Sequence, residues 1–196
     1  HMVVVGSGLN YATHGGIVAG ERNSVEGAYA CVTGGWDNRA SGTYASVTGG
    51  AQGWASGDYA AITGGWENDA EDPYASVSGG RQNVARDLCA SVSGGYDNAA
   101  RGEYTSVSGG ASNEARGDYS WVGAGKYNEA GGAYGGISGG EANEASGSYA
   151  SVSGGHACSA SADWSSVGGG FVRDVDWIAG GANDYLWRAG SLSPSK

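Results

Sequence analysis

The chain has 196 residues, of which 40 are Gly, and it contains one Phe and one Met. So few bulky apolar residues exclude a helical domain with an ordinary core, and two Pro without Gly at every third residue exclude collagen. A formal charge of −10 argues against a nucleic-acid partner, because phosphate binding needs clustered Lys and Arg. No apolar run is long enough to form a membrane-spanning helix.

We interpret residues 1–28 as an N-terminal cap followed by the first degenerate coils. His1-Met2 is typical of a cloning scar, and we expect any signal or anchor to lie outside this fragment. Gly6-Ser-Gly8 partly matches a dinucleotide-binding fingerprint, but Tyr11 occupies the third Gly position and no helix follows. We therefore predict a capping strand here and no cofactor site.

Residues 29–170 repeat with a period of 15 residues. Tyr holds the first place of each coil, except where Cys89 and Trp164 replace it. The consensus is Y-A-S-V-S-G-G-x-x-N-x-A-x-G-x, with Val or Ile at the fourth place of every coil. Asn holds the tenth place at Asn38, Asn68, Asn83, Asn98, Asn113, Asn128 and Asn143. Such regularity predicts stacked, equivalent coils.

The alternation within a coil predicts two short strands. Ala, Val and Gly of the second, fourth and sixth places share one parity and should face inward, whereas Ser of the third and fifth places should face outward. Asn, Ala and Gly of the tenth, twelfth and fourteenth places form a second inward set. A helix is excluded because each interior Gly would cost about 1 kcal/mol. We predict an all-β, parallel β-solenoid of about ten 15-residue coils, about 50 Å long, with a C-terminal cap or tip.

The repeated polar and Gly places have predicted structural roles. We expect the tenth-place Asn side chains to form an internal ladder, each amide donating to and accepting from its neighbour. Gly of the seventh and fourteenth places should turn the corners, with Asp72 and Asp87 replacing the latter in left-handed backbone. Because the inner side chains are small, one roll buries little apolar area, and we expect copies to associate as a homotrimer.

The run S-V-S-G-G-x-x-N-x-A-x-G, as at Ser91 to Gly102, resembles the head repeat of trimeric autotransporter adhesins, S-V-A-I-G-x-x-A-x-A-x-G. Those heads are left-handed parallel β-rolls that assemble as trimers on bacterial surfaces, and closely similar repeats occur in phage tail fibres. The resemblance spans roughly Gly15 to Gly170 and implies a trimeric adhesive rod. The family repeat is usually one residue shorter, with Ala and Ile where this chain has Asn and Gly. The N-x-A-x-G half is also similar to the N-x-V-x-G repeat of grass-type ice-binding β-rolls.

The reactive side chains are dispersed along the predicted rod. Cys31, Cys89 and Cys158 lie about four coils apart, or nearly 20 Å, so no disulfide or zinc site is expected. His14 and His156 are also isolated, so no Cys/His or Ser/His/Asp group can form. We expect no enzymatic activity, no metal and no cofactor.

Aromatic residues occupy the eighth place of alternate coils at Trp36, Trp66 and Tyr96. This spacing predicts a line of rings about 9.6 Å apart on an exposed edge, close to a disaccharide repeat. Such rings could stack on a linear glycan, with Trp54 widening the patch. The alternatives are corners that accept any large side chain, or rings that seal a subunit contact.

The outward third and fifth places predict a flat hydroxyl stripe. Its ice-binding candidates are Thr33, Thr48, Thr63, Ser76, Ser78, Ser91, Ser93, Ser106 and Ser108. Against ice binding, Ser predominates over Thr, and Trp121, Gly123 and Gly136 interrupt the plane. A solvated or subunit-facing sheet is the alternative.

Charged residues form two rows. Arg86, Arg101 and Arg116 occupy the thirteenth place, and we expect Glu103 and Asp118 to offset them. The eleventh place holds Glu114, Glu129 and Glu144. A carboxylate row could attract Ca²⁺, but Ca²⁺ ligands normally come from one loop with backbone carbonyls, so we predict a solvated face.

Residues 171–196 form the third predicted region, in which the 15-residue period is lost. We interpret them as a cap or distal tip, followed by a linker, because a solenoid must close its last coil. Aromatic residues at the end of a rod could also contact a partner, and the candidates are Trp177, Tyr185 and Trp187.

Together these features predict a non-enzymatic surface adhesin or fibre segment at an extracellular, cell-surface or virion location. The rod would attach to a cell-surface or glycan receptor. The alternative is a soluble ice-binding β-roll that uses the Ser/Thr stripe.

Overall fold

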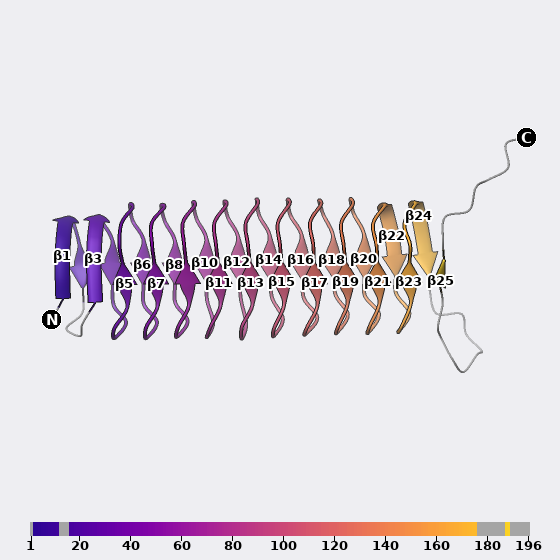
Figure 1. Ribbon diagram of the computed structural model, residues 1–196, viewed down its shortest axis with the longest axis horizontal. Coiled ribbons are helices and arrows are strands. Elements are labelled where there is room, and N and C mark those ends of the chain that lie inside the picture. The colour runs from indigo at the N-terminus through magenta and orange to yellow at the C-terminus, as the bar shows by residue number, and fades with distance from the viewer. Residues whose placement is uncertain (1, 12–15, 176–186, 189–196) are drawn as a thin grey trace, which may run out of the picture.

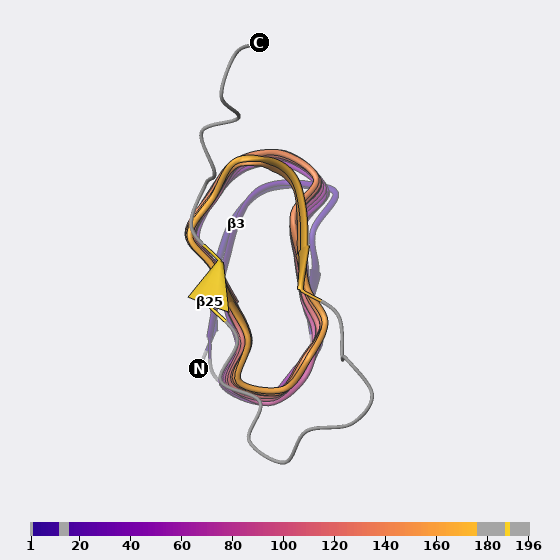
Figure 2. The same cartoon turned by 90° about the vertical axis from the view of Figure 1, so that its right-hand side faces the viewer.

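The computed structural model describes residues 2–11, 16–175 and 187–188, which form an all-β parallel solenoid of about eleven turns, as predicted. Figure 1 shows the coils stacked along one straight axis, and Figure 2 shows their outlines superimposed as one flattened oval. The described residues contain no helix, and so none that could cross a membrane.

The described strands form two parallel sheets, one on each long side of the oval. The 13-stranded sheet contains β1 (Met2–Ser7), β3 (Gly16–Glu21), β5 (Cys31–Val32), β7 (Ser46–Val47), β9 (Ala61–Ile62), β11 (Ser76–Val77), β13 (Ser91–Val92), β15 (Ser106–Val107), β17 (Trp121–Val122), β19 (Gly136–Ile137), β21 (Ser151–Val152), β23 (Ser166–Val167) and β25 (Trp187–Arg188). The 12-stranded sheet contains β2 (Asn10–Tyr11), β4 (Ser24–Val25), β6 (Arg39–Ala40), β8 (Trp54–Ala55), β10 (Asp69–Ala70), β12 (Val84–Ala85), β14 (Ala99–Ala100), β16 (Glu114–Ala115), β18 (Glu129–Ala130), β20 (Glu144–Ala145), β22 (His156–Ala160) and β24 (Phe171–Val175).

The interior consists of the predicted columns of small side chains. Val77, Val92 and Val107 pair in register, and each is 1% exposed. Ala of the second and twelfth places lines the rest of the interior and is equally buried. The sixth-place Gly does not belong to this inward set, which corrects the prediction. Gly79, for example, is half-buried and has no atom within 4 Å of the position where a Cβ would lie.

The tenth-place Asn column is buried, but it bonds mainly to the backbone. Asn98 Nδ2 donates to the carbonyls of Gly94 (2.9 Å) and Gly110 (3.0 Å). Asn98 Oδ1 accepts from the backbone N–H of Asn113 (3.0 Å). The predicted side-chain ladder is present as well, since Asn98 Nδ2 lies 3.2 Å from Asn83 Oδ1. Among the described residues this amide-to-amide contact runs only from Asn83 to Asn143.

The Gly residues act at the corners in two different ways. At the seventh place the backbone is left-handed, as at Gly80 (φ 85°), which favours Gly. At the fourteenth place the prediction of left-handed backbone is wrong, because only Asp87 (φ 89°) adopts it and Asp72 does not. Gly42 is needed for close approach instead, since a Cβ there would lie 2.0 Å from the carbonyl oxygen of Gly57.

The two ends differ from the middle of the rod. Near the N-terminus the spacing is 14 residues, because Val4 pairs with Val18 and Val18 with Val32. Residues 3–5 lie in a terminal strand, β1, as predicted. At the other end the period extends one strand further than predicted, because β24 pairs with β22 in the same register, His156 opposite Phe171, and it is then lost, because Trp187 of β25 pairs with Ser166 at a spacing of 21 residues. The parallel ladder itself holds that strand in step.

Candidate functional site

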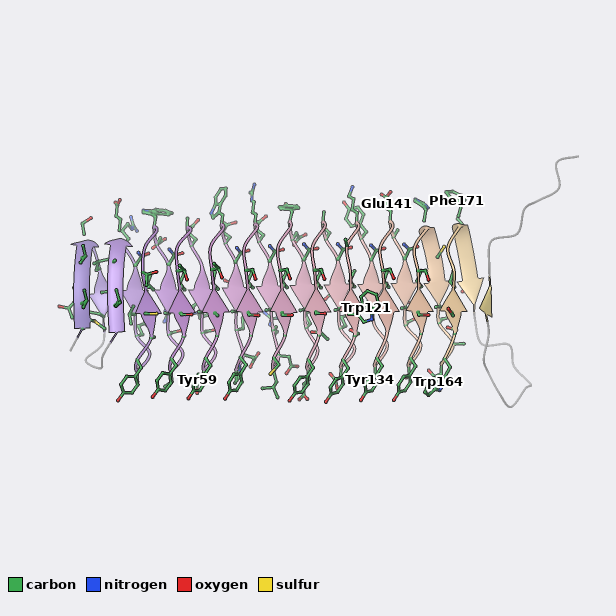
Figure 3. All side chains as sticks on the ribbon, in the orientation of Figure 1. Tyr59, Trp121, Tyr134, Glu141, Trp164 and Phe171 are labelled. Atoms are coloured by element: carbon green, nitrogen blue, oxygen red, sulfur yellow. The ribbon has the colours of Figure 1, made fainter. Side chains whose placement is uncertain are left out.

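The structure places Trp36, Trp66 and Tyr96 on one edge of the oval, as predicted. Parallel bridges join the eighth places of consecutive coils, from Glu21 through Trp36, Ala51, Trp66 and Arg81 to Tyr96. The three aromatic residues are 40%, 44% and 48% exposed. Figure 3 shows this edge along the top of the rod, where Glu141 and Phe171 of the same column are labelled. We call it the mixed edge.

Arginine side chains accompany the aromatic rings of the mixed edge, which the sequence analysis did not anticipate. The guanidinium carbon of Arg81 lies 4.5 Å from the ring centroid of Trp66 and 5.7 Å from that of Tyr96. Arg22 lies 5.7 Å from the ring centroid of Trp36. The signal was present, because Arg81 occupies the eighth place of the coil between the two aromatic residues. The edge therefore combines aromatic surface with positive charge.

Hydrogen bonds orient two of the indole rings. Trp66 Nε1 donates to Gln52 Oε1 (2.7 Å). Trp54 Nε1 donates to Ser41 Oγ (3.0 Å), and Arg39 lies 5.3 Å from its ring centroid. Trp54 belongs to β8 on the face of the 12-stranded sheet, so it does not extend the eighth-place column.

The predicted candidates at the C-terminal end are only partly placed. Trp187 is the first residue of β25, and its backbone pairs with Ser166 of β23. Trp177 and Tyr185 lie outside the described residues. A tip that contacts a partner therefore stays a prediction.

The predicted hydroxyl stripe lies on the outer face of the 13-stranded sheet. Its fifth-place members Thr33, Thr48, Thr63, Ser78, Ser93 and Ser108 are exposed, and its third-place members Ser76, Ser91 and Ser106 are half-buried. Trp121 ends this regular array. Its indole covers the next rung, since a Cβ on Gly136 would lie 2.5 Å from Trp121 Nε1. Figure 3 shows Trp121 on the broad side of the rod, between the two edges.

The opposite edge carries a feature that the sequence analysis missed, a ladder of first-place aromatic rings. Adjacent ring centroids lie 4.9–5.1 Å apart in one run and 4.0–5.0 Å apart in the other. The first run is Tyr29, Tyr44, Tyr59 and Tyr74, and the second is Tyr104, Tyr119, Tyr134, Tyr149 and Trp164. Figure 3 shows Tyr59, Tyr134 and Trp164 along the bottom of the rod. We call this row the tyrosine edge, and its signal was the period of Tyr itself.

The chain itself only partly buries the tyrosine edge. Each of its residues has left-handed backbone, with φ of 56–61° for the Tyr residues, and such a conformation costs a non-Gly residue about 1–2 kcal/mol. Stacking returns about 0.5–1.5 kcal/mol per pair. That gain adds to the apolar area that stacking buries, yet the rings stay 43–56% exposed. Among the described residues their phenol hydroxyls form no hydrogen bond.

The charged rows pair differently from the prediction. Arg116 contacts Glu114 (2.7 Å) and Glu129 (2.8 Å) of the eleventh place, and Arg101 also contacts Glu114 (2.9 Å). Arg86 contacts Glu71 of the thirteenth place (2.6 Å), so these residues, and not Glu103 or Asp118, pair with the Arg row. The hydrogen bond to Glu114 raises the pKa of Arg116. Asp118 Oδ1 instead accepts from the backbone N–H of Glu103 (3.1 Å).

The chemistry-bearing residues stay apart. Cys31, Cys89 and Cys158 are free thiols, and burial raises the pKa of Cys31, which disfavours the nucleophilic thiolate. Within the described part of the chain, no three His, Cys, Asp or Glu side chains gather as a metal site would require. A depression of about 200 Å³, lined by residues including Arg101 and Glu114, lies on the face of the 12-stranded sheet.

No protein-family model matches the sequence, and a search of curated proteins also finds no match. The similarity to adhesin-head and ice-binding repeats therefore stays a prediction. What the geometry offers is a closed rod with two exposed edges, one mixed and one tyrosine-lined, and a flat hydroxyl face.

Proposed function

We propose that the protein is a non-enzymatic extracellular rod, an adhesin or fibre segment, which attaches through its mixed edge to a glycan on a cell surface. The supporting observation is the line formed by Trp36, Trp66 and Tyr96, each at least 40% exposed on alternate coils. Alternate rungs of a parallel sheet lie about 9.6 Å apart, so an extended polymer can meet successive rings.

The environment of these rings favours a carbohydrate ligand. Exposed aromatic rings offer apolar surface to the C–H faces of sugars, while Arg81 and Gln52 supply polar groups beside Trp66. The buried Asn column and the paired strands hold the rungs at a fixed spacing, so the ligand binds a preorganised surface. A rod of stacked coils also holds such a surface away from its point of attachment.

A glycan array followed by binding to the selected polymer tests this function. We expect Trp66→Ala to weaken binding about tenfold or more, because a central aromatic anchor is lost. Trp121→Ala is the matched control, since Trp121 is 42% exposed on the broad face and Trp66 is 44% exposed. A silent array, or equal binding by the parent and Trp66→Ala, would contradict attachment through the mixed edge.

Ice binding is the second candidate, and the exposed fifth-place hydroxyls from Thr33 to Ser108 favour it. These residues lie on one parallel sheet and so repeat about every 4.8 Å. Thermal hysteresis in the parent that is lost in Ser78→Tyr and Ser93→Tyr would support this function. Unchanged hysteresis in both variants would remove the stripe as its site.

The similarity to adhesin heads also implies that three copies assemble. Exposed aromatic residues along the tyrosine edge, opposite the mixed edge, support association of copies, because exposed apolar patches of this extent commonly mark contact sites. The mass of the parent in solution, from light scattering, distinguishes a trimer from other states.

A further inference from the structure

Two columns of the rod share the same unusual backbone but not the same residues. Both the first and the ninth place are left-handed, as shown by Tyr119 (φ 60°) and Ser112 (φ 52°). The ninth place is variable and includes Asp37, Gln52, Glu67, Ala142 and Tyr127. The first place is Tyr in eight coils of ten. The backbone therefore does not require Tyr, and the repeated choice needs another reason.

The exposed part of the tyrosine edge indicates what kind of contact it offers. Because each ring stacks on its neighbours, the ring faces within a run are covered, and the ring rims and phenol hydroxyls remain exposed. A partner therefore meets a row of apolar rims and hydroxyl groups that repeats every 4.7–5.1 Å. Each hydroxyl can both donate and accept a hydrogen bond.

The size of this edge fits a protein partner. An aromatic side chain offers roughly 200 Å², so nine half-exposed rings present on the order of 900 Å². A stable interface buries about 800 Å² on each partner. Only a partner with the same axial repeat can contact every rung, and a second copy of this chain has that repeat.

We propose that the tyrosine edge is the seam along which copies of this chain associate side by side. Phenol hydroxyls of one ladder lie opposite those of the other and exchange hydrogen bonds, while the ring rims exclude water between them. This proposal does not rest on glycan attachment, which uses the opposite edge.

Cys89 sets the register of the seam. It interrupts the ladder at the fifth of ten rungs, between Tyr74 and Tyr104. In a parallel pair the register with the most facing rings places Cys89 of one copy opposite Cys89 of the other. In an antiparallel pair two registers share the largest number of facing rings, because four rungs precede Cys89 and five follow it: one places Cys89 opposite Cys89, and the other places it opposite Tyr104. Each of these registers brings the two thiols to within one rung of each other, which is about 5 Å along the rod.

Acidic residues flank the tyrosine edge at the fifteenth place. Asp58, Asp118 and Asp163 each accept a hydrogen bond there from the backbone N–H of the fifteenth-place residue one coil earlier. Two seams in contact bring such rows together, and added salt screens their repulsion. Association should therefore strengthen with ionic strength, whereas a contact made of opposite charges would weaken.

Sedimentation of the full chain with Asn substitutions tests the seam. Asn favours left-handed backbone, so Tyr119→Asn with Tyr134→Asn should preserve the fold while raising the dissociation constant about tenfold or more. Tyr127→Asn is the matched control, because Tyr127 is also left-handed and 55% exposed but lies in the ninth place. A circular dichroism melt confirms that each variant is folded.

Three results would overturn the proposal. One is a parent that stays monomeric at about 0.1 mM, where an interface of this area should be populated. Another is an unchanged dissociation constant in the folded double variant, and the third is equal dissociation of the Tyr127→Asn control.

A thiol cross-linker supplies a second measurement. We expect a flexible bismaleimide to link two copies through Cys89, and Cys89→Ser to abolish the product. Cys31 lies on the face of the 13-stranded sheet, and Cys158 is buried. Cross-links through Cys31 that persist in Cys89→Ser would show that copies associate through that face, against the proposal.

Discussion

Two columns of repeated residues run along this rod, the tenth-place Asn and the first-place Tyr. They differ in how deeply they are buried and in whether the chain supplies partners for their hydrogen bonds. The Asn side chains are 0–1% exposed, and within the fold they donate to backbone carbonyls and accept from backbone N–H groups. The Tyr rings are 43–56% exposed, and their hydroxyls have no partner among the described residues. Repetition in the sequence does not show whether a residue serves the fold or a contact with another molecule. Burial and internal hydrogen bonds mark the Asn column as part of the fold, and the Tyr column lacks both.

The largest expected effect comes from breaking the Asn column. Asn98→Ala leaves the carbonyl of Gly94 and the N–H of Asn113 without their partner, and each such group costs about 1–3 kcal/mol, whereas the carbonyl of Gly110 keeps the backbone N–H of Tyr96 (2.9 Å). We expect the free energy of unfolding to fall by about 3–5 kcal/mol in urea denaturation. Asp97→Asn, at the adjacent exposed position, should change it by less than about 0.5 kcal/mol. A loss below about 1 kcal/mol for Asn98→Ala would contradict the role of the column.

Gly79 and Gly80, the sixth and seventh places of one coil, are both repeated along the chain, but only Gly80 is required by the backbone. Gly80 is left-handed, and a Cβ there would lie 2.2 Å from the carbonyl oxygen of Gly95. Gly79 has free space around it. We expect Gly80→Ala to destabilise by about 3 kcal/mol and Gly79→Ala to stay within about 1 kcal/mol of the parent in the same assay. Equal losses would refute this assignment of the corner.

A pH series examines the outward face of the 12-stranded sheet. Burial, with smaller effects of Glu71 and Glu67, raises the pKa of Asp69 to about 6. A raised pKa means that the folded state favours the protonated side chain of Asp69 over its carboxylate. The fold is therefore more stable at low pH, where Asp69 is protonated, and it loses this stability as pH rises through about 6. Because solvent screens this half-buried group, we expect Asp69→Asn to stabilise by about 1 kcal/mol at pH 7.

The advantage of Asp69→Asn should vanish near pH 4, where the parent side chain is protonated. Thermal melts of both proteins from pH 4 to pH 8 measure this difference. An advantage that did not depend on pH would point to a packing effect instead of ionisation.

The smallest effect on stability is expected at the tyrosine edge. Tyr119→Asn removes two ring contacts but relieves left-handed strain, so we expect the free energy of unfolding to change by less than about 1 kcal/mol in urea denaturation. A loss as large as that of Asn98→Ala would show that the ladder is a stability element like the Asn column.

The interior of the rod was predictable because its rules are local and repeated. A period of 15 with Val or Ile at every fourth place predicts the column in which Val77, Val92 and Val107 lie in register. The line of Trp36, Trp66 and Tyr96 followed from the same counting. Residues 15 apart in the sequence lie directly above one another, because parallel coils stack without a shift in register.

The side-chain contacts between coils and the register of β24 could not be predicted, because the period does not specify which side chains reach each other. The pairing of Arg116 with Glu114 and Glu129 depends on which long side chains reach each other across rungs. The position of Arg81 beside Trp66 and Tyr96 depends on side-chain orientation. The register of β24 was missed because main-chain hydrogen bonds hold a strand in step even where its side chains no longer repeat.

The sequence by itself determined the stacking of equivalent coils, since an unbroken period allows only one alignment of small inward residues. The tertiary structure alone decided which repeated residues are buried with their hydrogen bonds satisfied and which stay exposed. Alternation of side chains tells inside from outside on a strand, but it is lost at the corners, where backbone dihedrals direct the side chain. The first-place Tyr lies at such a corner, and only coordinates show its rings stacked and half exposed.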